Sequence, residues 1–379
     1  MTDTIAPTIK TSRLLLWLPL IIGAIGALLL LEYMRETVVF RVENAAFGRE
    51  TSRFMPTGEG QNQCADASDS AKCIGVWHKA GDPPAVIWFG NSQLEGINRF
   101  KPGDLNAPEL LHRALGARGK YVVTYSQPNA NLTEEAIIWA AIQPVYRPRL
   151  LILPVCYDDI RELGVRDTVG DMLDDPKVSA RLKRAPYWAQ IASAVGEAMK
   201  QNAPLKAETH LSLQNRTEAA ATGFLSHHWS LWSDRANMRG ILGFAVHGLR
   251  NEVLGIHSTS KRPVDPSVLV NRLTLLDGMI AEARADGAQV LLYAPPYRQD
   301  IDGPYLADDY HVFKAQLAAI AKKHGAHFVD IDPIVPGPEW ATVTDDVFGF
   351  QEPDFMHFTA AGHQRLAAHI DGAARRMGY

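Results

Sequence analysis

The chain contains few cysteines and little excess charge of either sign. Three cysteines in 379 residues are too few for a small scaffold held together by disulfides. The formal net charge is −4 and no basic tail is present, so a nucleic-acid partner is not expected. Internal repeats and low-complexity tracts are also lacking. With 46% hydrophobic residues, the composition indicates one large globular domain or two smaller ones.

One long apolar run lies near the N-terminus. Residues 14–31 carry no charged side chain, and the run is as long as the roughly 17 to 25 residues of a membrane-spanning helix. We expect a transmembrane helix over residues 14–32 and a cytoplasmic N-terminus over residues 1–13, because Lys10 and Arg13 precede the run. The protein would then be a single-pass protein of the inner (cytoplasmic) membrane with a periplasmic catalytic domain. A cleaved signal peptide and a buried core helix are the alternatives.

Residues 33–80 contain proline, several glycines and two cysteines, and we expect an irregular extracytoplasmic stalk. Cys64 and Cys73 bracket a polar loop that could close as a disulfide in an oxidising compartment. Two free thiols are the alternative, and a metal site is less expected at this spacing. Cys156 ends an apolar run and is expected to be a small buried hydrophobic residue. We expect no metal ion and no cofactor.

Strand-like and helix-like segments alternate after residue 80. This order predicts the α/β class, a three-layer α/β/α sandwich with a mainly five-stranded parallel sheet over residues 81–379. Strand signals are missing between about residues 164 and 265, where Trp188, Trp229 and Trp232 occur in Ala-rich helical segments. We expect a helical insertion there, as a lid, a membrane-facing surface, a partner site or ordinary helical packing. The expected strands are residues 85–89, 121–125, 150–155, 289–293 and 327–331.

Two short motifs at opposite ends of this region carry candidate chemistry. The first apolar run breaks at Gly90 and presents Ser92 at its end, where α/β folds bind their ligands. Near the C-terminus, Asp354 and His357 precede the last helix. A serine hydroxyl needs a base and a group that orients the base, so we predict Ser92 as nucleophile, His357 as base and Asp354 as orienter. A surface turn and a helix-capping loop are the alternative, and His363 is expected at the surface.

The same residues carry a resemblance to a known family. Gly90-Asn91-Ser92 after the first strand and Asp354-Phe-Met-His357 before the last helix resemble the SGNH, or GDSL-like, superfamily of esterases and acyltransferases. That resemblance implies a Ser-His-Asp triad, an acyl-enzyme intermediate and a substrate held near Asn91.

The second family block, which usually supplies a glycine after the second strand, differs in this chain. Asn129 stands at the expected glycine. Its backbone N–H and that of Ser92 can still donate to an oxyanion. Asn131, two residues later, could supply a side-chain amide.

The third block, usually Gly-x-Asn-Asp, aligns with Cys156-Tyr-Asp-Asp159. Asp158 therefore stands where the family has an asparagine donor, and an ionised carboxylate would repel the oxyanion. Either Asn129 or Asn131 replaces this donor, or Asp158 turns towards Arg161 or Arg166, or the hole has only two donors.

The altered blocks behind an anchor helix resemble SGNH proteins that work beside membrane-bound O-acyltransferases in alginate O-acetylation and teichoic-acid D-alanylation. This resemblance implies an O-acyltransferase or O-acyl (acetyl) esterase acting on a cell-envelope polysaccharide, with the membrane and such an acyltransferase as partners. Tyr297 and Arg298 are expected to line the cleft and bind a sugar or an acid group. A lipase or thioesterase acting on membrane lipid, and a non-catalytic protein that binds a glycan or a partner, are the competing functions.

Overall fold

The computed structural model describes residues 13–37, 51, 60–207, 213–344 and 351–379. The chain forms two compact units. Unit 1 comprises Met1–Ala46 and Leu211–Gly248, and unit 2 comprises Phe47–His210 and Leu249–Tyr379. The sheet and both candidate motifs lie in unit 2.

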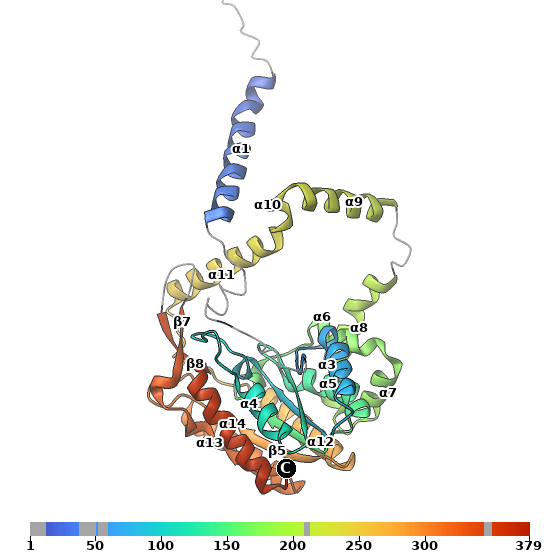
Figure 1. Cartoon of the computed structure of the whole chain (residues 1–379). Helices are drawn as coiled ribbons and strands as arrows, with labels where there is room; N and C mark the ends of the chain where they lie inside the picture. Colours follow the sequence, from blue (N-terminus) through green and yellow to red (C-terminus); the bar gives the residue numbers. More distant parts are fainter. Residues whose placement is uncertain (1–12, 38–50, 52–59, 208–212, 345–350) are drawn as a thin grey trace, which may run out of the picture. The chain divides into compact units, whose positions relative to one another are not determined.

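Unit 2 is built on a six-stranded parallel sheet with the strand order β1-β3-β2-β4-β5-β6. Figure 1 shows β5 of this sheet among the helices of unit 2. Strands β2, β3 and β4 are buried along their whole length, as expected for apolar strands covered on both faces. The α/β class and the parallel sheet are confirmed, whereas the expected count of five strands is wrong. The strands are β1 (Gln63–Cys64), β2 (Ala85–Gly90), β3 (Tyr121–Ser126), β4 (Leu150–Pro154), β5 (Gln289–Ala294) and β6 (His327–Asp330).

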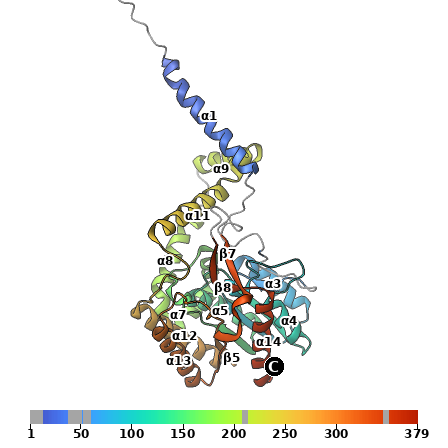
Figure 2. The ribbon, with the colours of Figure 1, turned by 90° about the vertical axis from the view of Figure 1, so that its left-hand side faces the viewer.

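Helices cover both faces of this sheet and form two hydrophobic cores. Helices α4 (Ala107–Gly116) and α14 (Ala360–Arg376) pack together on one face. Figure 2 shows them on the opposite side of the sheet from α7 (Pro176–Arg184) and α12 (Pro266–Ala285). Side chains of β2 alternate between the two cores, as the period of a strand requires. The second face also packs against α5 (Leu132–Tyr146), α8 (Trp188–Ala207) and α13 (Ala307–Lys323).

The expectation of an irregular stalk is wrong for residues 60–80. β1 pairs with β3, with Gln63 opposite Thr124, and is followed by α3 (Ala67–Lys79). A disulfide joins Cys64 to Cys73, and the buried Trp77 donates its indole N–H to the Pro83 carbonyl at 2.9 Å. The disulfide and this tryptophan attach the segment to the sheet. The rest of the expected stalk lies largely outside the described residues.

The described part of residues 164–265 is helical and holds no strand. Its helices divide between the two units. In unit 2, α6 (Asp167–Gly170), α7 and the start of α8 add Leu182, Ile191 and Val195 to the core. The others are α9 (Leu213–His228) and α10 (Ser230–Ser233), both in unit 1, and α11 (Arg235–Leu254), which runs from unit 1 into unit 2.

In unit 1, α1 (Arg13–Thr37) contains the apolar run. Its described side chains are largely exposed, with Trp17 at 62% and Leu29 at 66%. Near the end of this run, Ser230 of α10 donates a hydrogen bond to Glu32 at 2.7 Å. Within the described residues, no helix is both long and apolar enough to cross a membrane.

Candidate active site

The turn after β2 positions Ser92. β2 ends at Gly90, and Asn91 then caps the short 3₁₀ helix Ser92–Leu94 by accepting the Gln93 N–H at 2.9 Å. A Cβ atom at Gly90 would lie 2.4 Å from Leu94 Cδ1, so only glycine fits there. The turn therefore presents Ser92 at the carboxyl end of a central strand, where α/β folds bind ligands.

Asp354 and His357 lie on a strand, β8 (Gln351–Phe358), rather than in the expected loop. β8 pairs antiparallel with β7 (Trp340–Thr344). Residues 353 and 358 of β8 pair with residues 342 and 340 of β7, so five steps along β8 match only two along β7. This difference marks a bulge. Strand residues three apart normally face opposite sides, and the bulge is what brings Asp354 and His357 together.

The three predicted catalytic side chains form one hydrogen-bonded chain. His357 Nε2 lies 2.9 Å from Ser92 Oγ, and His357 Nδ1 lies 2.8 Å from Asp354 Oδ2. Both distances are those of ordinary hydrogen bonds. The structure thus brings together residues that are 265 positions apart in the sequence.

Asp354 is buried, at 3% exposure, and is held in its ionised form. Burial raises the pKa of its carboxyl group, but the charge of His357 and hydrogen bonds from His357 and Met356 outweigh this and leave the pKa below its ordinary value. Oδ1 accepts the N–H groups of Met356 at 2.8 Å and His357 at 2.9 Å. The carboxylate can therefore both orient the imidazole and stabilise its cation.

Asn98 is a second partner of Asp354 that the sequence reasoning missed. Its Nδ2 lies 3.5 Å from Asp354 Oδ2, and the residue is 6% exposed. Asn98 and Arg99 both adopt positive φ values, 53° and 68°, in the loop after the Ser92 turn. Two consecutive non-glycine residues with positive φ are uncommon. No pattern in the sequence predicted the contact between Asn98 and Asp354.

From the sequence we expected Asn91 to lie near the substrate, but its side chain is turned into the protein. It is 3% exposed, and its Nδ2 donates to both carboxylate oxygens of Asp159, at 3.0 and 2.8 Å, and to Cys156 Sγ at 3.2 Å. Asn91 therefore ties the Ser92 turn to Cys156 and Asp159, which follow β4. Asp159 was also missed, although it is the last residue of the third block. Burial of its carboxyl group, helped by the Asp158 charge, raises the pKa of Asp159 to about 8.

Two backbone N–H groups stand at the expected oxyanion positions. Asn129 is exposed and has a φ of 53°, the left-handed conformation that explains why the family has a glycine there. In the described part of the chain, we find no acceptor for the N–H of Ser92 or of Asn129. The side chain of Asn131, by contrast, caps α5. It accepts the N–H groups of Thr133 and Glu134 at 2.9 and 3.2 Å and donates to the Gly164 carbonyl at 3.3 Å.

Asp158 is paired with two arginines. Arg161 lies 3.5 Å from Oδ1 and Arg262 lies 3.3 Å from Oδ2. Of the two partners considered from the sequence, Arg161 is present, whereas Arg166 binds Glu134 at 2.7 Å. The charge of Asp158 is therefore balanced by its partners, as in the alternative in which Asp158 turns towards Arg161.

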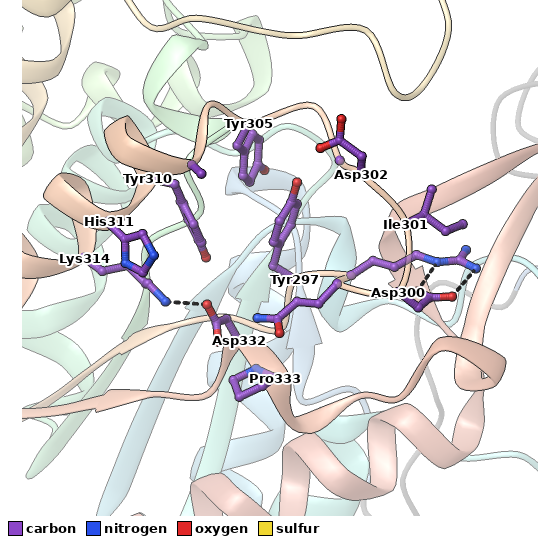
Figure 3. Close-up of a pocket in the computed structure, with 14 residues that line it drawn as sticks. Tyr297, Asp300, Ile301, Asp302, Tyr305, Tyr310, His311, Lys314, Asp332 and Pro333 are labelled. Carbon is purple, nitrogen blue, oxygen red and sulfur yellow. Dashed lines mark hydrogen bonds and ion pairs between the residues drawn. The ribbon is translucent and has the colours of Figure 1, made fainter.

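Arg298 and Tyr297 follow β5 and differ in their roles. Arg298 binds both oxygens of Asp300, at 2.8 and 3.2 Å, and its Nη1 lies 3.4 Å from the Asp354 carbonyl. Arg298 therefore has its charge balanced by Asp300 and contacts β8, and it also lines the cavity, so binding of a sugar or an acid group stays a prediction. Tyr297 lines a cavity of about 590 Å³ (Figure 3).

His363 is fully buried, so the expectation of a surface residue is wrong. Its Nδ1 accepts the N–H of Ala107, the first residue of α4, at 3.1 Å. Burial and the charge of His357 lower the pKa of His363 to about 3, so the ring is neutral. His363 is buried because α14 packs against α4, and its ring joins the two helices. Thr359 stands at the N-cap position of α14 and makes no side-chain capping bond.

The family model of GDSL-like lipases and acylhydrolases matches residues 252–365. This segment contains Asp354 and His357 but not Ser92, so the match supports the SGNH resemblance of the second motif. No curated protein matches the chain. One similar solved structure, an alpha/beta hydrolase enzyme from the metagenome of Lake Arreo, is 14% identical with a TM-score of 0.38, covering 76% of this chain and 94% of that one. Another, an acetylxylan esterase from Geobacillus stearothermophilus, is 14% identical with a TM-score of 0.35, covering 78% and 94%.

Proposed function

We propose that this protein is an SGNH-type serine enzyme that forms an acyl-enzyme from an O-acyl ester. The observation that carries the proposal is the hydrogen-bonded chain from Ser92 through His357 to the buried Asp354. The match of residues 252–365 to the GDSL-like family agrees with it.

The geometry supports a two-step reaction. His357 Nε2 accepts the Ser92 proton as Oγ attacks the acyl carbonyl, and Asp354 stabilises the imidazolium that forms. The N–H groups of Ser92 and Asn129 donate to the oxyanion of the tetrahedral intermediate. When that intermediate collapses, the bond to the alcohol oxygen breaks and His357 returns the proton to the leaving alcohol.

The acceptor of the acyl group decides between hydrolysis and transfer. Water attacking the acyl-Ser92 carbonyl, with its proton taken by His357, releases the free acid, and a sugar hydroxyl in the same position becomes the new ester. Both reactions use the same three residues. We propose an O-acyl esterase or O-acyltransferase of a cell-envelope polysaccharide.

Two observations support an envelope location. The Cys64–Cys73 disulfide is typical of an oxidising compartment, and α1 exposes large apolar side chains along its described length. We propose that α1 is a single-pass anchor that leaves unit 2 outside the cytoplasm. A membrane-bound O-acyltransferase is the proposed partner, which copurification in mild detergent would reveal.

The test is labelling and hydrolysis by the full chain and by Ser92→Ala. A fluorophosphonate probe should label the wild type, because His357 makes Ser92 nucleophilic, and Ser92→Ala should lose the label. Hydrolysis of 4-nitrophenyl acetate should fall at least about 10³-fold in that variant. Ser179→Ala, a helix serine of α7 that binds the Leu173 carbonyl, is the matched control.

The competing functions predict different results. A wild-type protein that is neither labelled nor active would favour a non-catalytic glycan-binding or partner-binding protein. Strong preference for long over short acyl chains would favour a lipase or thioesterase.

A further inference from the structure

The cavity beside Tyr297 lies between the loop after β5, the start of α13 and the 3₁₀ helix Asp332–Ile334. Its volume of about 590 Å³ falls within the range of about 300–1,000 Å³ typical of small-ligand sites. Figure 3 shows Tyr297, Tyr305 and Tyr310 grouped on one side of it. The Tyr297 and Tyr305 rings stack at 4.5 Å and 15°, and Tyr310 lies 5.3 Å from Tyr297. The cavity thus has an aromatic wall.

Each Asp, Arg and Lys side chain in its lining is already paired with an opposite charge. Arg298 binds Asp300, and Lys314 binds Asp332 and, at 2.8 Å, Asp330. The remaining lining carboxylate, Asp302, binds Lys261 at 2.7 Å. An anionic ligand would therefore meet no unbalanced cation in this lining.

A cationic ligand is disfavoured as well. Aromatic groups can bind ammonium ions over their faces, but the Lys314 ammonium already lies 5.1 Å from the centre of the Tyr310 ring. The lining holds three carboxylates, Asp300, Asp302 and Asp332, and two cations, Arg298 and Lys314, so its small excess of negative charge disfavours an anionic ligand. One wall is aromatic, and hydrogen-bonding groups line the rest.

This combination suits a neutral sugar. The C–H faces of a pyranose pack on aromatic rings, and its hydroxyls exchange hydrogen bonds with carboxylate and amide groups. Gln299 is an exposed member of the lining, and its uncharged side-chain amide can make such bonds.

Residues that line or flank the cavity contact residues next to the triad. The Tyr297 ring lies 6.2 Å from that of Phe355, which sits between Asp354 and His357 on β8. Arg298 contacts the Asp354 carbonyl, and Gln93, next to Ser92, donates to the Pro296 carbonyl at 3.0 Å. The loop after β5 thus contributes both to the cavity lining and to contacts with the Ser92 turn and β8.

We infer that this cavity binds a neutral sugar unit of the acylated glycan, so the substrate class is a neutral rather than a uronic-acid polysaccharide. This inference rests on the proposed function, because only that proposal implies that the bound glycan carries an acyl group. Sugar binding is a separate property, measurable in a protein that cannot react.

The first experiment measures equilibrium binding to the full-length Ser92→Ala protein in mild detergent. The probes are cellohexaose and mannohexaose as neutral glycans, hexagalacturonate as an acidic glycan and choline as a cation. We expect at least one neutral hexasaccharide to bind more tightly than hexagalacturonate and choline. Adding Tyr297→Leu should weaken that binding at least about tenfold, and Gln299→Ala about threefold. Tyr379→Leu, at the C-terminus and outside the cavity, is the matched control.

Tighter binding of hexagalacturonate or choline would overturn the inference, as would a lack of binding by both neutral glycans. So would a Tyr297→Leu protein that binds them like its parent. In catalytically active protein, Tyr297→Leu should lower the ratio of kcat/KM on acetylated neutral oligosaccharide to kcat/KM on 4-nitrophenyl acetate. A loss of structure would lower both values in parallel and leave the ratio constant. If Ser92 reacts with the phosphonate probe while no sugar binds, the inference fails and the proposed function stands.

Discussion

The side-chain amide of Asn91 donates hydrogen bonds to the carboxyl group of Asp159, and this contact holds the turn that carries Ser92. Asn91 is a capping residue on one side, through the Gln93 N–H, and a donor to Asp159 on the other. No cationic side chain forms an ion pair with Asp159 among the described residues. Its carboxyl group is therefore kept protonated at neutral pH by its surroundings, which makes the turn sensitive to pH.

The pH dependence of stability should change in Asp159→Asn. The pKa of Asp159 is raised from 3.8 to about 8, so between these values the folded protein keeps a proton that the unfolded chain releases. The free energy of unfolding contributed by this group therefore falls as pH rises through that window, by at most about 1.4 kcal/mol per unit. In Asp159→Asn, the free energy of unfolding, measured by urea denaturation at pH 5, 6, 7 and 8, should fall less steeply with pH than in the wild type. Equal slopes in the two proteins would contradict this assignment, and Asp167→Asn, exposed on α6, is the control.

At the scale of secondary-structure elements, the site depends on two irregular strand ends. β2 must turn sharply at Gly90 and β8 must bulge between residues 353 and 358. Regular strands would point Asp354 and His357 to opposite faces of the hairpin. The catalytic geometry thus comes from the places where the strands depart from their regular form.

Gly90→Ala should damage both stability and activity. The new Cβ would lie 2.4 and 2.8 Å from Leu94 Cδ1 and Cγ, and Leu94 is only 1% exposed, so it has no free space to move into. We expect a loss of about 1–3 kcal/mol in the free energy of unfolding, together with a lower kcat because Ser92 shifts relative to His357. Chemical unfolding and ester hydrolysis measure the two effects. Gly116→Ala in α4, where a Cβ meets nothing within 4 Å, should be neutral or stabilising. Wild-type behaviour of Gly90→Ala would show that the turn tolerates a side chain.

At the scale of the whole molecule, the chain combines a folded enzyme-like unit with a second unit of exposed helices. Unit 2 buries its apolar side chains in two cores, one on each face of the sheet. In unit 1, α1 leaves Leu20 63% exposed and Leu29 66% exposed. Such exposure is unfavourable in water and favourable in lipid. This contrast is the physical basis for the proposed anchor.

The double substitution Leu20→Arg and Leu29→Arg should release the protein from membranes. Each arginine at the centre of an anchor helix costs about 2.5–3.5 kcal/mol on translocon-based scales. We expect the wild type to stay in the membrane fraction after an alkaline carbonate wash and the double variant to shift to the supernatant, as judged by immunoblotting. Leu163→Arg in unit 2, where Leu163 is also 66% exposed, should fractionate like the wild type. Wild-type protein in the supernatant would refute the anchor.

Several structural features were readable from local patterns, and others were not. Apolar runs bounded by turn residues located five of the six strands of the parallel sheet to within a residue or two, whereas the β7–β8 hairpin was missed. The two-residue β1 was missed because so short a strand has no period, and only its pairing with β3 and the nearby disulfide define it. His363 was misplaced because burial of a helix residue depends on its neighbour α4, which the sequence does not show.

The chain's local patterns were sufficient to identify Ser92, Asp354 and His357, because a glycine after a buried strand and an acid-histidine pair before a helix reflect short-range constraints. Tertiary structure alone decided the roles of Asn91, Asn131, Asp158 and Arg298, which the sequence placed near substrate or oxyanion. Each of these polar groups found a partner from a distant segment or from its own helix end, and a buried or half-buried polar group takes whichever partner packing supplies. Such partners are set by the approach of segments far apart in the chain, so the triad could be foreseen and its surroundings could not.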